Sequence, residues 1–277
     1  GQDGAFLSRY LISLNYYVIG FERRCSVNNR ERLEKFKLLS NSAFCLLDGD
    51  VTDNRSVRLA LERARKENIH RCGQYPVEVY NLAAMSDVGI SFNQPKLCFD
   101  VNTNGVLNIL EEIISICKVD FRFYQAGTSE QFGSSVDEDG FQRETTPFHP
   151  RSPYAVSKVA AHYLVQNYRE AYGLHASVGI LFNHESELRG ANFLTRKVTN
   201  YVGELYYKIK QEEYKLSKEF STKDREKLSR DLIANILNYP KLKLGNLESG
   251  RDWGYADDYI RAMHLILQQK TPDDYII

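Results

Sequence analysis

Short apolar runs alternate with longer stretches of helical periodicity, and this alternation restricts the possible fold more than any other feature of the chain. The apolar runs predict strands at residues 16–21, 43–50, 77–84, 121–129 and 176–183. The helical patterns lie at residues 4–15, 53–68, 106–117 and 153–172. Apolar strands that alternate with helices are typical of a parallel sheet covered on both faces. The sequence therefore predicts an α/β fold with a doubly wound parallel sheet.

Polar residues follow directly where these apolar runs stop. In open parallel sheets, ligands bind beside the carboxyl ends of the strands. We therefore expect functional residues at five such ends, namely 23–24, 50, 81–86, 128–130 and 183–184. The chain also begins with "GQDG", a Gly-x-x-Gly pair that leads into a helical pattern with no apolar run before it. Such a pair is typical of the end of a dinucleotide-binding fingerprint.

Composition excludes several classes of function. The 36 basic and 36 acidic residues give zero net charge, which predicts no general affinity for nucleic acid or an anionic membrane. No run approaches the roughly 18 apolar residues that a membrane-spanning helix needs. The five cysteines are widely spaced without a C-x-x-C pair, and the six histidines form no H-x-x-x-H pair. We therefore expect reduced thiols in a cytoplasmic protein and no metal site.

The most specific stretch for chemistry is "RSPYAVSK", which places Tyr154 and Lys158 four residues apart at the start of a predicted helix. Both side chains then lie on one helix face. An ammonium group beside a phenol favours the phenolate and lowers its pKa from about 10. Tyr154 is thus a candidate acid/base, and Lys158 can also donate to the ribose hydroxyls of a cofactor. The alternative interpretation is a plain helix start, with Ser152 as the cap and Pro153 at the first position.

A second candidate group, "QAGTSEQFG", lies at the end of the fourth predicted strand. Thr128 and Ser129 supply hydroxyls that can hydrogen-bond a substrate oxygen, and Glu130 supplies a carboxylate. Oxidation of a sugar hydroxyl needs only a hydroxyl and a tyrosine, whereas removal of a proton next to the resulting ketone needs a further base. Glu130 is therefore the discriminating residue, although a carboxylate here also fits a helix start or the surface.

Together, Thr128, Tyr154 and Lys158 resemble the catalytic set of the short-chain dehydrogenase/reductase family, whose extended branch has a Rossmann-type fold. Longer blocks are similar to the GDP-mannose 4,6-dehydratases over nearly the whole chain: "FYQAGTSEQFG", "ETTPFHPRSPYAVSK", "NYREAYGL", "GILFNHES", "RGANFLTRK" and "LGNLESGRDWGYADDY". The resemblance implies an NADP-dependent hydro-lyase that converts GDP-mannose to GDP-4-keto-6-deoxymannose, a precursor of GDP-fucose and related deoxysugars.

The resemblance also implies roles for the catalytic residues. Tyr154 would take the proton of the sugar C4 hydroxyl, which Thr128 would hydrogen-bond, while Lys158 assists Tyr154. Glu130 would remove the C5 proton, after which the C6 hydroxyl leaves as water and hydride returns to C6. The substrate-binding residues implied are Ser129, Asn183, Lys197 and Arg251.

The cofactor-binding set combines physical argument with resemblance. Gly1 and Gly4 allow close approach of a pyrophosphate to a helix N-terminus. Arg23 and Arg24 follow the second strand, where they suit a 2′-phosphate and hence NADP rather than NAD. The full set expected is Gly1, Gln2, Asp3, Gly4, Arg23, Arg24, Asp50, Val51, Leu82, Ala84, Ser86, Tyr154, Lys158, His184 and Arg189.

For domain organisation we expect an NADP-binding Rossmann domain at 1–182 and a partial, smaller substrate-binding region at 183–277. A Lys/Glu-rich insertion at about 208–237 is interpreted as a solvated helical segment or a loop without chemistry. The first strand and the C-terminal part of the fold are predicted to be missing, so that the chain is a fragment. A homo-oligomer, dimer or tetramer, is expected.

Two alternatives stay open at this point. One is another nucleotide-sugar epimerase or dehydratase of the same branch, although Glu130 argues against a 4-epimerase, which needs no C5 base. The other is a catalytically impaired homologue that binds nucleotide. Its support lies in Met85, Asp87 and Leu97, which depart from the family pattern.

Overall fold

The computed structural model describes residues 1–26, 30–71, 73, 75–218, 222–248 and 250–277. They form two compact units, one made of Gly1–His184 with Asp252–Ile277 and the other of Glu185–Arg251. The functional division that the sequence suggests at residue 182 stays a prediction.

The first unit is a parallel α/β structure, which confirms the predicted fold class. The strands are β1 (Val18–Glu22), β2 (Phe44–Asp48), β3 (Val77–Asn81), β4 (Phe121–Ala126), β5 (His175–Ile180), β6 (Asn183–Glu185), β7 (Trp253–Tyr255) and β8 (Asp274–Ile276). One sheet has the order β3-β4-β5-β8, β1 pairs with β2, and β6 pairs with β7. The pairs in the four-stranded sheet and the β1–β2 pair are parallel.

One difference from the expected single sheet lies between β1 and β3. In the described part of the chain these two strands are not hydrogen-bonded to each other. The classic doubly wound order, 3-2-1-4-5-6, has its first strand at this position.

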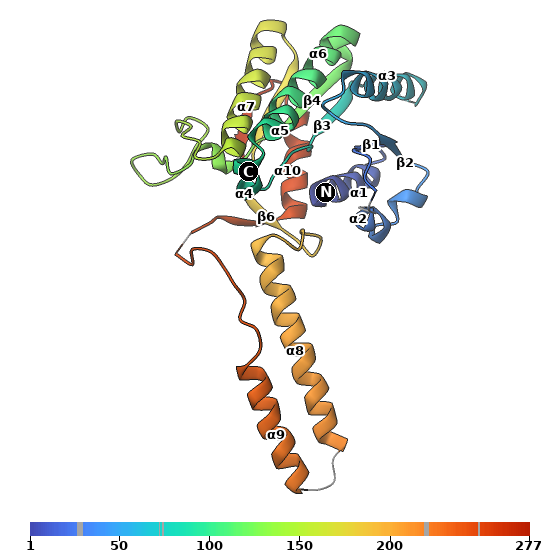
Figure 1. Ribbon diagram of the computed structural model, residues 1–277. Coiled ribbons are helices and arrows are strands. Elements are labelled where there is room, and N and C mark those ends of the chain that lie inside the picture. Colours follow the sequence, from blue (N-terminus) through green and yellow to red (C-terminus); the bar gives the residue numbers. More distant parts are fainter. Residues whose placement is uncertain (27–29, 72, 74, 219–221, 249) are drawn as a thin grey trace. The chain divides into compact units, whose positions relative to one another are not determined.

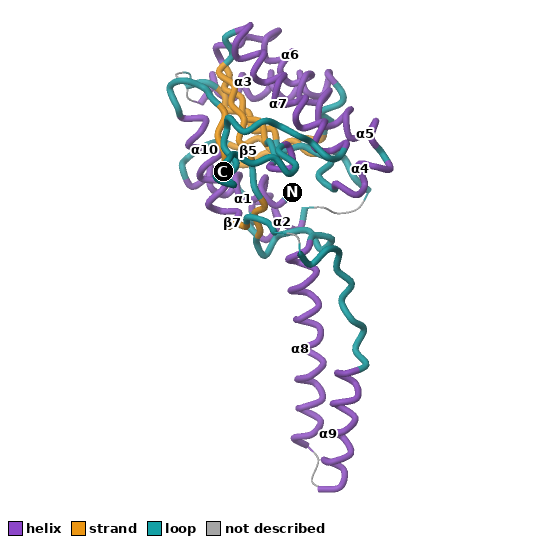
Figure 2. The backbone as a smooth tube through the Cα atoms, turned by 90° about the vertical axis from the view of Figure 1, so that its left-hand side faces the viewer, coloured by secondary structure: helices purple, strands orange, loops and turns teal. Residues whose placement is uncertain are grey.

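Helices cover both faces of the four-stranded sheet (Figures 1 and 2). The longer ones in this unit are α1 (Gln2–Ser13), α3 (Asn54–Arg71), α6 (Gly105–Cys117), α7 (Pro153–Tyr172) and α10 (Ala256–Gln268). The short ones are α2 (Glu31–Lys35), α4 (Val88–Asn93) and α5 (Pro95–Phe99), with single turns η1 (Leu38–Ser40), η2 (Asp100–Asn104), η3 (Lys118–Asp120) and η4 (Ser129–Gln131). Helices α3, α6 and α7 lie on one face, and α1 and α10 lie on the other (Figure 1).

The main core lies between the sheet and the α3–α6–α7 layer. Ile113 of α6, Phe123 of β4, Val165 of α7 and Val178 of β5 are each 0% exposed. Burial of side chains of this size stabilises the fold by about 1.5–3 kcal/mol each before entropy is subtracted. This packing fixes α7 against β4 and β5, and so fixes the element that carries Tyr154 and Lys158.

The second unit contains α8 (Leu194–Lys218) and α9 (Thr222–Leu237), which lie side by side (Figures 1 and 2). Residues 208–237, the predicted insertion, are thus helical where they are described, and the helical interpretation of this segment is correct. Among the described residues, no helix combines the length and the apolar composition needed to cross a bilayer.

Candidate active site

The start of α7 places Tyr154 and Lys158 on its buried face. Ser152 caps the helix, because its Oγ accepts a hydrogen bond from the N–H of Ala155 (3.1 Å), and Pro153 is the first helical residue. Tyr154 is 8% exposed and Lys158 is 3% exposed. Lys158 Nζ donates to the carbonyl oxygen of Ala126, the last residue of β4, at 2.9 Å. This bond holds the candidate catalytic helix at the carboxyl end of β4.

Burial of Lys158 has an electrostatic consequence. Removal of the ammonium from water disfavours its charged form and lowers its pKa from the ordinary 10.5 to about 8. The folded protein therefore holds a buried cation at neutral pH that one carbonyl only partly compensates.

Lys158→Met is expected to stabilise the ligand-free protein while it impairs any chemistry at Tyr154. The lysine pKa is lower in the folded than in the unfolded chain, so its charge opposes folding fully below about pH 8. The substitution should raise the free energy of unfolding at pH 7 by about 1–3 kcal/mol. That gain should disappear as the pH rises from 8 to 10.5. Urea unfolding of both proteins across this range measures it, and a loss of stability at pH 7 would contradict it.

The turn after β4 is built around Thr128, which caps η4. Its Oγ1 accepts from the N–H of Glu130 (3.3 Å), and its own N–H donates to Oε1 of Gln131 (2.9 Å), a capping box. The N–H of Ser129 donates to the carbonyl oxygen of Leu181 (2.8 Å), which ties the turn to the chain just after β5. Thr128 is 8% exposed, and Ser129 and Glu130 are half-buried. The Thr128 hydroxyl and the Glu130 carboxylate therefore lie two and four residues beyond the carbonyl that Lys158 contacts.

The N-terminus of α1 brings together three residues of the predicted cofactor set. Asp3 Oδ2 lies 3.1 Å from His184 Nε2, and Gln2 Nε2 donates to the carbonyl oxygen of His184 (3.3 Å). The other ring nitrogen of His184, Nδ1, is 2.8 Å from the carbonyl oxygen of Phe182. The imidazole stacks on the Tyr259 ring with centroids 4.4 Å apart. These contacts join the first turn of α1 to the chain beyond β5.

The glycines of the fingerprint border open space. A Cβ atom added to Gly1 or to Gly4 would meet no atom within 4 Å. Gly1 is the N-cap of α1 and has no side chain with which to cap it. Both glycines therefore leave room for close approach at the side of the first turn of α1.

Arg23 and Arg24 are exposed directly after β1. Glu22, the nearest acid, is 2.5 Å from Arg30, so its charge is compensated. The Glu22 carboxylate, which could otherwise accept a hydrogen bond from a free ribose 2′-hydroxyl, is therefore paired with Arg30. Arg23 and Arg24 supply two cations at the end of the strand.

Asp50 and Val51 have local partners in this structure. Asp50 Oδ1 accepts from the N–H (2.9 Å) and the hydroxyl (2.8 Å) of Thr52. Val51 is 7% exposed and packs in the core, and its carbonyl oxygen accepts from Asn108 Nδ2 (2.9 Å). Their predicted contact with adenine stays a prediction.

The loop after β3, which contains Leu82, Ala84 and Ser86, is fastened by Asn102. Asn102 Oδ1 accepts from the N–H of Met85 (2.8 Å), and its Nδ2 donates to Ser157 Oγ of α7 (3.0 Å). Asn102 is 1% exposed. It therefore connects the predicted cofactor loop with the helix that carries Tyr154 and Lys158.

One departure from the family pattern has a structural explanation. Asp87 is the N-cap of α4, and its Oδ1 accepts from the N–H of Ile90 at 3.0 Å. Its carboxylate is therefore engaged in starting a helix.

Three predicted residues belong to the second unit. Arg189 lies 3.2 Å from a carboxylate oxygen of Glu185 and stacks over the Phe193 ring at 3.7 Å. Lys197 and Arg251 are exposed. A fourth predicted residue, Asn183, lies in β6 within the first unit and is half-buried. Each unit is described by itself, and the binding roles of these residues stay predictions.

An open depression of about 610 Å³ lies beside the start of α7 and is separate from the catalytic group. Its lining is Phe92, Pro95, Phe99, His149, Pro150, Arg151, Ser152, Pro153 and Val156. None of the candidate catalytic residues is among these.

Four residues around the site were not predicted from the sequence: Asn102, Gln131, His162 and Tyr259. Gln131 had a readable signal, because the pattern Thr-x-x-Gln is a capping box. His162 lies one helical turn after Lys158, which placed it near the same face. The contacts of Asn102 and Tyr259 join segments that are distant in sequence, and no local pattern indicates them.

Known proteins of one family are similar to this chain over its whole length. The family model described as GDP-mannose 4,6 dehydratase matches residues 1–225 and 211–277. The chain is 41% identical over 285 residues to GDP-mannose 4,6 dehydratase 1 of Arabidopsis thaliana, with all of this chain and 67% of that protein covered. It is 38% identical over 283 residues to a GDP-mannose 4,6-dehydratase of Vibrio cholerae, with 100% and 64% covered. The chain thus spans about two thirds of the length of these relatives.

Solved structures agree on the fold. The dTDP-glucose 4,6-dehydratase DesIV of Streptomyces venezuelae, with NAD and TYD bound, matches with a TM-score of 0.72 and 20% identity. This match covers 100% of the chain and 72% of DesIV. UDP-glucose 4-epimerase of Thermus thermophilus, in complex with NAD, matches with a TM-score of 0.73, 21% identity and coverage of 100% and 74%. With the family model and the relatives covering the whole sequence, the chain belongs to the GDP-mannose 4,6-dehydratase family.

Proposed function

We propose that this protein catalyses the NADP-dependent dehydration of GDP-mannose to GDP-4-keto-6-deoxymannose. The observation that carries the proposal is the 2.9 Å bond from Lys158 Nζ to the Ala126 carbonyl oxygen. It fastens the Tyr-x-x-x-Lys helix to the strand end that carries Thr128 and Glu130, so that hydroxyl, phenol, ammonium and carboxylate share one region of the sheet. Family membership supplies the substrate, because its named relatives act on GDP-mannose.

The residues present fit a nicotinamide dinucleotide. The first turn of α1, where Gly1 and Gly4 carry no side chain, suits a pyrophosphate. Arg23 and Arg24, with Glu22 engaged by Arg30, favour a 2′-phosphate and hence NADP. When bound, NADP would accept a hydride from C4 of the sugar and return one to C6, so that the cofactor is regenerated in each cycle.

The chain's own residues handle protons in this proposal. Tyr154, beside the Lys158 ammonium, takes the proton of the C4 hydroxyl, while the Thr128 hydroxyl holds that oxygen. Glu130 removes the proton at C5, which the C4 ketone has made acidic, and passes it to the C6 hydroxyl, which leaves as water. When hydride returns to C6, C5 takes up the proton that Tyr154 accepted. The carboxylate distinguishes this reaction from 4-epimerisation, which needs no base at C5.

Further parts of the proposal rest on family resemblance. Ser129 and Asn183 would contact the sugar, and Lys197 and Arg251 would contact the diphosphate, for which cations are suited. Gln2, Asp3, Asp50, Val51, Leu82, Ala84, Ser86, His184 and Arg189 would complete the cofactor site. A cytoplasmic homo-oligomer, dimer or tetramer, is part of the same proposal.

The Arg23→Ser/Arg24→Ser double variant should lose preference for NADP. Charge-assisted hydrogen bonds to phosphate contribute about 1.5–3 kcal/mol, so the Kd for NADP should rise roughly 10- to 100-fold. The Kd for NAD should change little. Titration calorimetry measures both, with Lys66→Ser on α3 as an exposed cation control. Equal losses for both cofactors would contradict the assignment of these arginines to the 2′-phosphate.

The direct test of the activity is incubation of the protein with NADP and GDP-mannose, followed by mass spectrometry and NMR of the sugar nucleotide. The proposal expects loss of one water and a 4-keto-6-deoxy sugar. A 4-epimer of unchanged mass would favour the epimerase alternative. Tight NADP binding without any product would favour the impaired homologue.

A further inference from the structure

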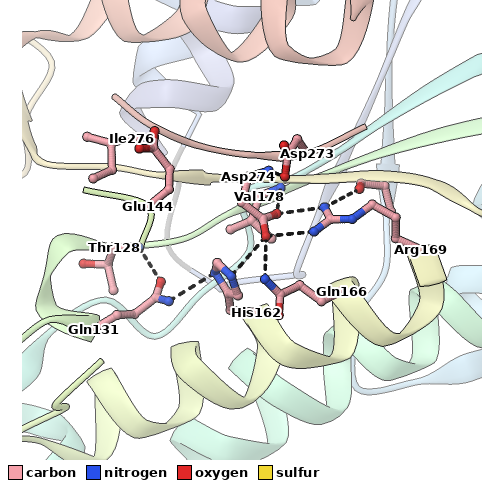
Figure 3. Close-up of polar contacts among 11 residues, drawn as sticks. Thr128, Gln131, Glu144, His162, Gln166, Arg169, Val178, Asp273, Asp274 and Ile276 are labelled. Carbon is pink, nitrogen blue, oxygen red and sulfur yellow. Dashed lines mark hydrogen bonds and ion pairs between the residues drawn. The ribbon is translucent and has the colours of Figure 1, made fainter. Parts of the chain in front are cut away.

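A buried chain of polar contacts runs from Thr128 to β8 (Figure 3). The Thr128 N–H donates to Gln131 Oε1 (2.9 Å), and Gln131 Nε2 lies 3.3 Å from His162 Nδ1. His162 Nε2 lies 3.3 Å from Asp274 Oδ2. Gln131 is 0% exposed and His162 is 3% exposed, so water cannot readily replace these partners.

The groups at the two ends of this series of contacts, the Thr128 N–H and the Asp274 carboxylate, determine which atom donates in each contact between them. A backbone N–H can only donate, so the Gln131 amide must present its oxygen to Thr128. Its NH₂ group then faces His162, and His162 Nδ1 must be the unprotonated acceptor. The proton of the neutral imidazole is therefore on Nε2, where it is donated to Asp274. With the proton on Nδ1 instead, Nδ1–H and the Gln131 NH₂ group would face each other as two donors. Turning the Gln131 amide around would only move the clash between two donors to the Thr128 N–H.

The carboxylate of Asp274 in β8 accepts hydrogen bonds from several donors besides His162. Arg169 donates to both of its carboxylate oxygens at 2.8 Å, Gln166 Nε2 donates at 2.7 Å, and the Val178 N–H donates at 3.1 Å. Burial raises the pKa of this carboxyl, but the hydrogen bonds from Arg169 and His162 outweigh burial and lower it well below the usual range. Asp274 therefore stays ionised and accepts the His162 proton.

We propose that Gln131 and His162 are positioning residues for the turn that carries Thr128 and Glu130. The effects on kcat that this proposal predicts rest on the proposed function. The Gln131 side chain holds the Thr128 backbone, and the neutral Nε2–H form of His162 holds the Gln131 amide in the required orientation. Asp274 sets that form of His162. This series of contacts through Gln131, His162 and Asp274, here called the relay, extends from β8 to the turn that carries the hydroxyl and carboxylate assigned to the reaction.

His162 acts through Gln131 and does not contact the substrate in this proposal. Its ring packs against those of Phe148 and Tyr163, with centroids 4.9 Å and 5.9 Å away. Both ring nitrogens are engaged within the protein. Among the described residues, the ionisable and charged side chains that contact this cluster include Asp274 of β8, Arg169 of α7 and Tyr163 of α7.

The kinetic test compares His162→Phe, His162→Gln and Gln131→Leu. His162→Phe keeps an aromatic ring without polar atoms, whereas the amide of His162→Gln again offers one acceptor and one donor. Because a misplacement of about 1 Å costs about 100-fold in rate, we expect kcat to fall roughly 10- to 100-fold in His162→Phe and Gln131→Leu. KM for GDP-mannose should stay within about twofold, and His162→Gln should recover most of kcat. Unchanged kcat in folded Gln131→Leu, or equal losses in both His162 variants, would overturn the proposal.

A second measurement does not depend on activity. Two-bond ¹⁵N–¹H correlation NMR of the full chain, labelled at histidine nitrogens, reports which ring nitrogen of His162 carries the proton. The proposal expects the neutral Nε2–H form at pH 7, and loss of its signal in His162→Phe assigns it. An Nδ1–H form or an imidazolium would overturn the relay. If wild type shows the expected tautomer but makes no product, the proposed function fails and the relay stands.

Discussion

Glu130→Gln is expected to lower the rate of GDP-4-keto-6-deoxymannose formation by about 10²- to 10⁴-fold, the usual contribution of a positioned base. Glutamine has nearly the same shape but cannot accept a proton from C5. The contact of residue 130 with Thr128 Oγ1 uses its backbone N–H, so the turn should persist in the variant. KM should change little, because the loss is confined to the chemical step.

Rapid-quench measurement of product in a single turnover checks this expectation. In the proposed reaction, oxidation at C4 uses Tyr154 and Thr128 and does not need Glu130, so the 4-keto sugar that still carries its C6 hydroxyl should accumulate. Glu138→Gln, an exposed carboxylate in the following loop, is the matched control and should keep full activity. Turnover of Glu130→Gln within threefold of wild type would contradict the assigned base.

Asp274→Asn is expected to lower the free energy of unfolding by about 3 kcal/mol. Its carboxylate is 8% exposed and accepts both hydrogen bonds of Arg169, whose side chain is 14% exposed. Removal of one partner leaves the other charge buried and uncompensated, which typically costs 3–5 kcal/mol. In addition, the asparagine amide has a single acceptor oxygen, so it cannot accept hydrogen bonds from all of the donors that surround the Asp274 carboxylate. Equilibrium urea unfolding measures the change, with the exposed neighbour Asp273→Asn as the matched control.

The same carboxylate predicts a pH dependence of stability. Its pKa is lower in the folded than in the unfolded chain, because hydrogen bonds from Arg169 and His162 outweigh burial. Its contribution is thus fully present above the unfolded value of about 3.9 and is lost as the pH falls toward the folded value. Wild type should lose stability more steeply than Asp274→Asn below about pH 4. Parallel slopes for the two proteins there would contradict the assignment of this carboxylate as ionised and buried.

Most of the strand and helix order of the first unit was predictable from the sequence. The apolar runs fall on β1 to β5, and the pattern at 153–172 coincides with α7 because Ser152, Pro153 and Gly173 supply local start and stop signals. Helix α10 was not predicted, although Ile260, Met263 and Leu267 line its buried face. The short helices α4 and α5 carry too few turns for a periodicity to be read.

The candidate site likewise contains residues that the sequence predicts and contacts that it does not. Tyr154 and Lys158 share a helix face by spacing alone, and Thr128 and Glu130 are marked by the end of an apolar run. The Lys158–Ala126 bond, the Gln131–His162 contact and the His162–Asp274 contact join residues that lie 31 or more positions apart. Such contacts depend on tertiary packing, so a single sequence without this structure does not contain a local signal for them.

The central claim, dehydration by internal transfer of hydride, is tested most directly with GDP-mannose that carries deuterium at C4. The protein is incubated with this substrate and NADP, and the product is analysed by ²H NMR. The account predicts that the label appears at C6 of a 4-keto-6-deoxy sugar, because hydride removed from C4 returns to C6 in the same cycle. Label retained at C4, or a product that has kept its C6 hydroxyl, would contradict it.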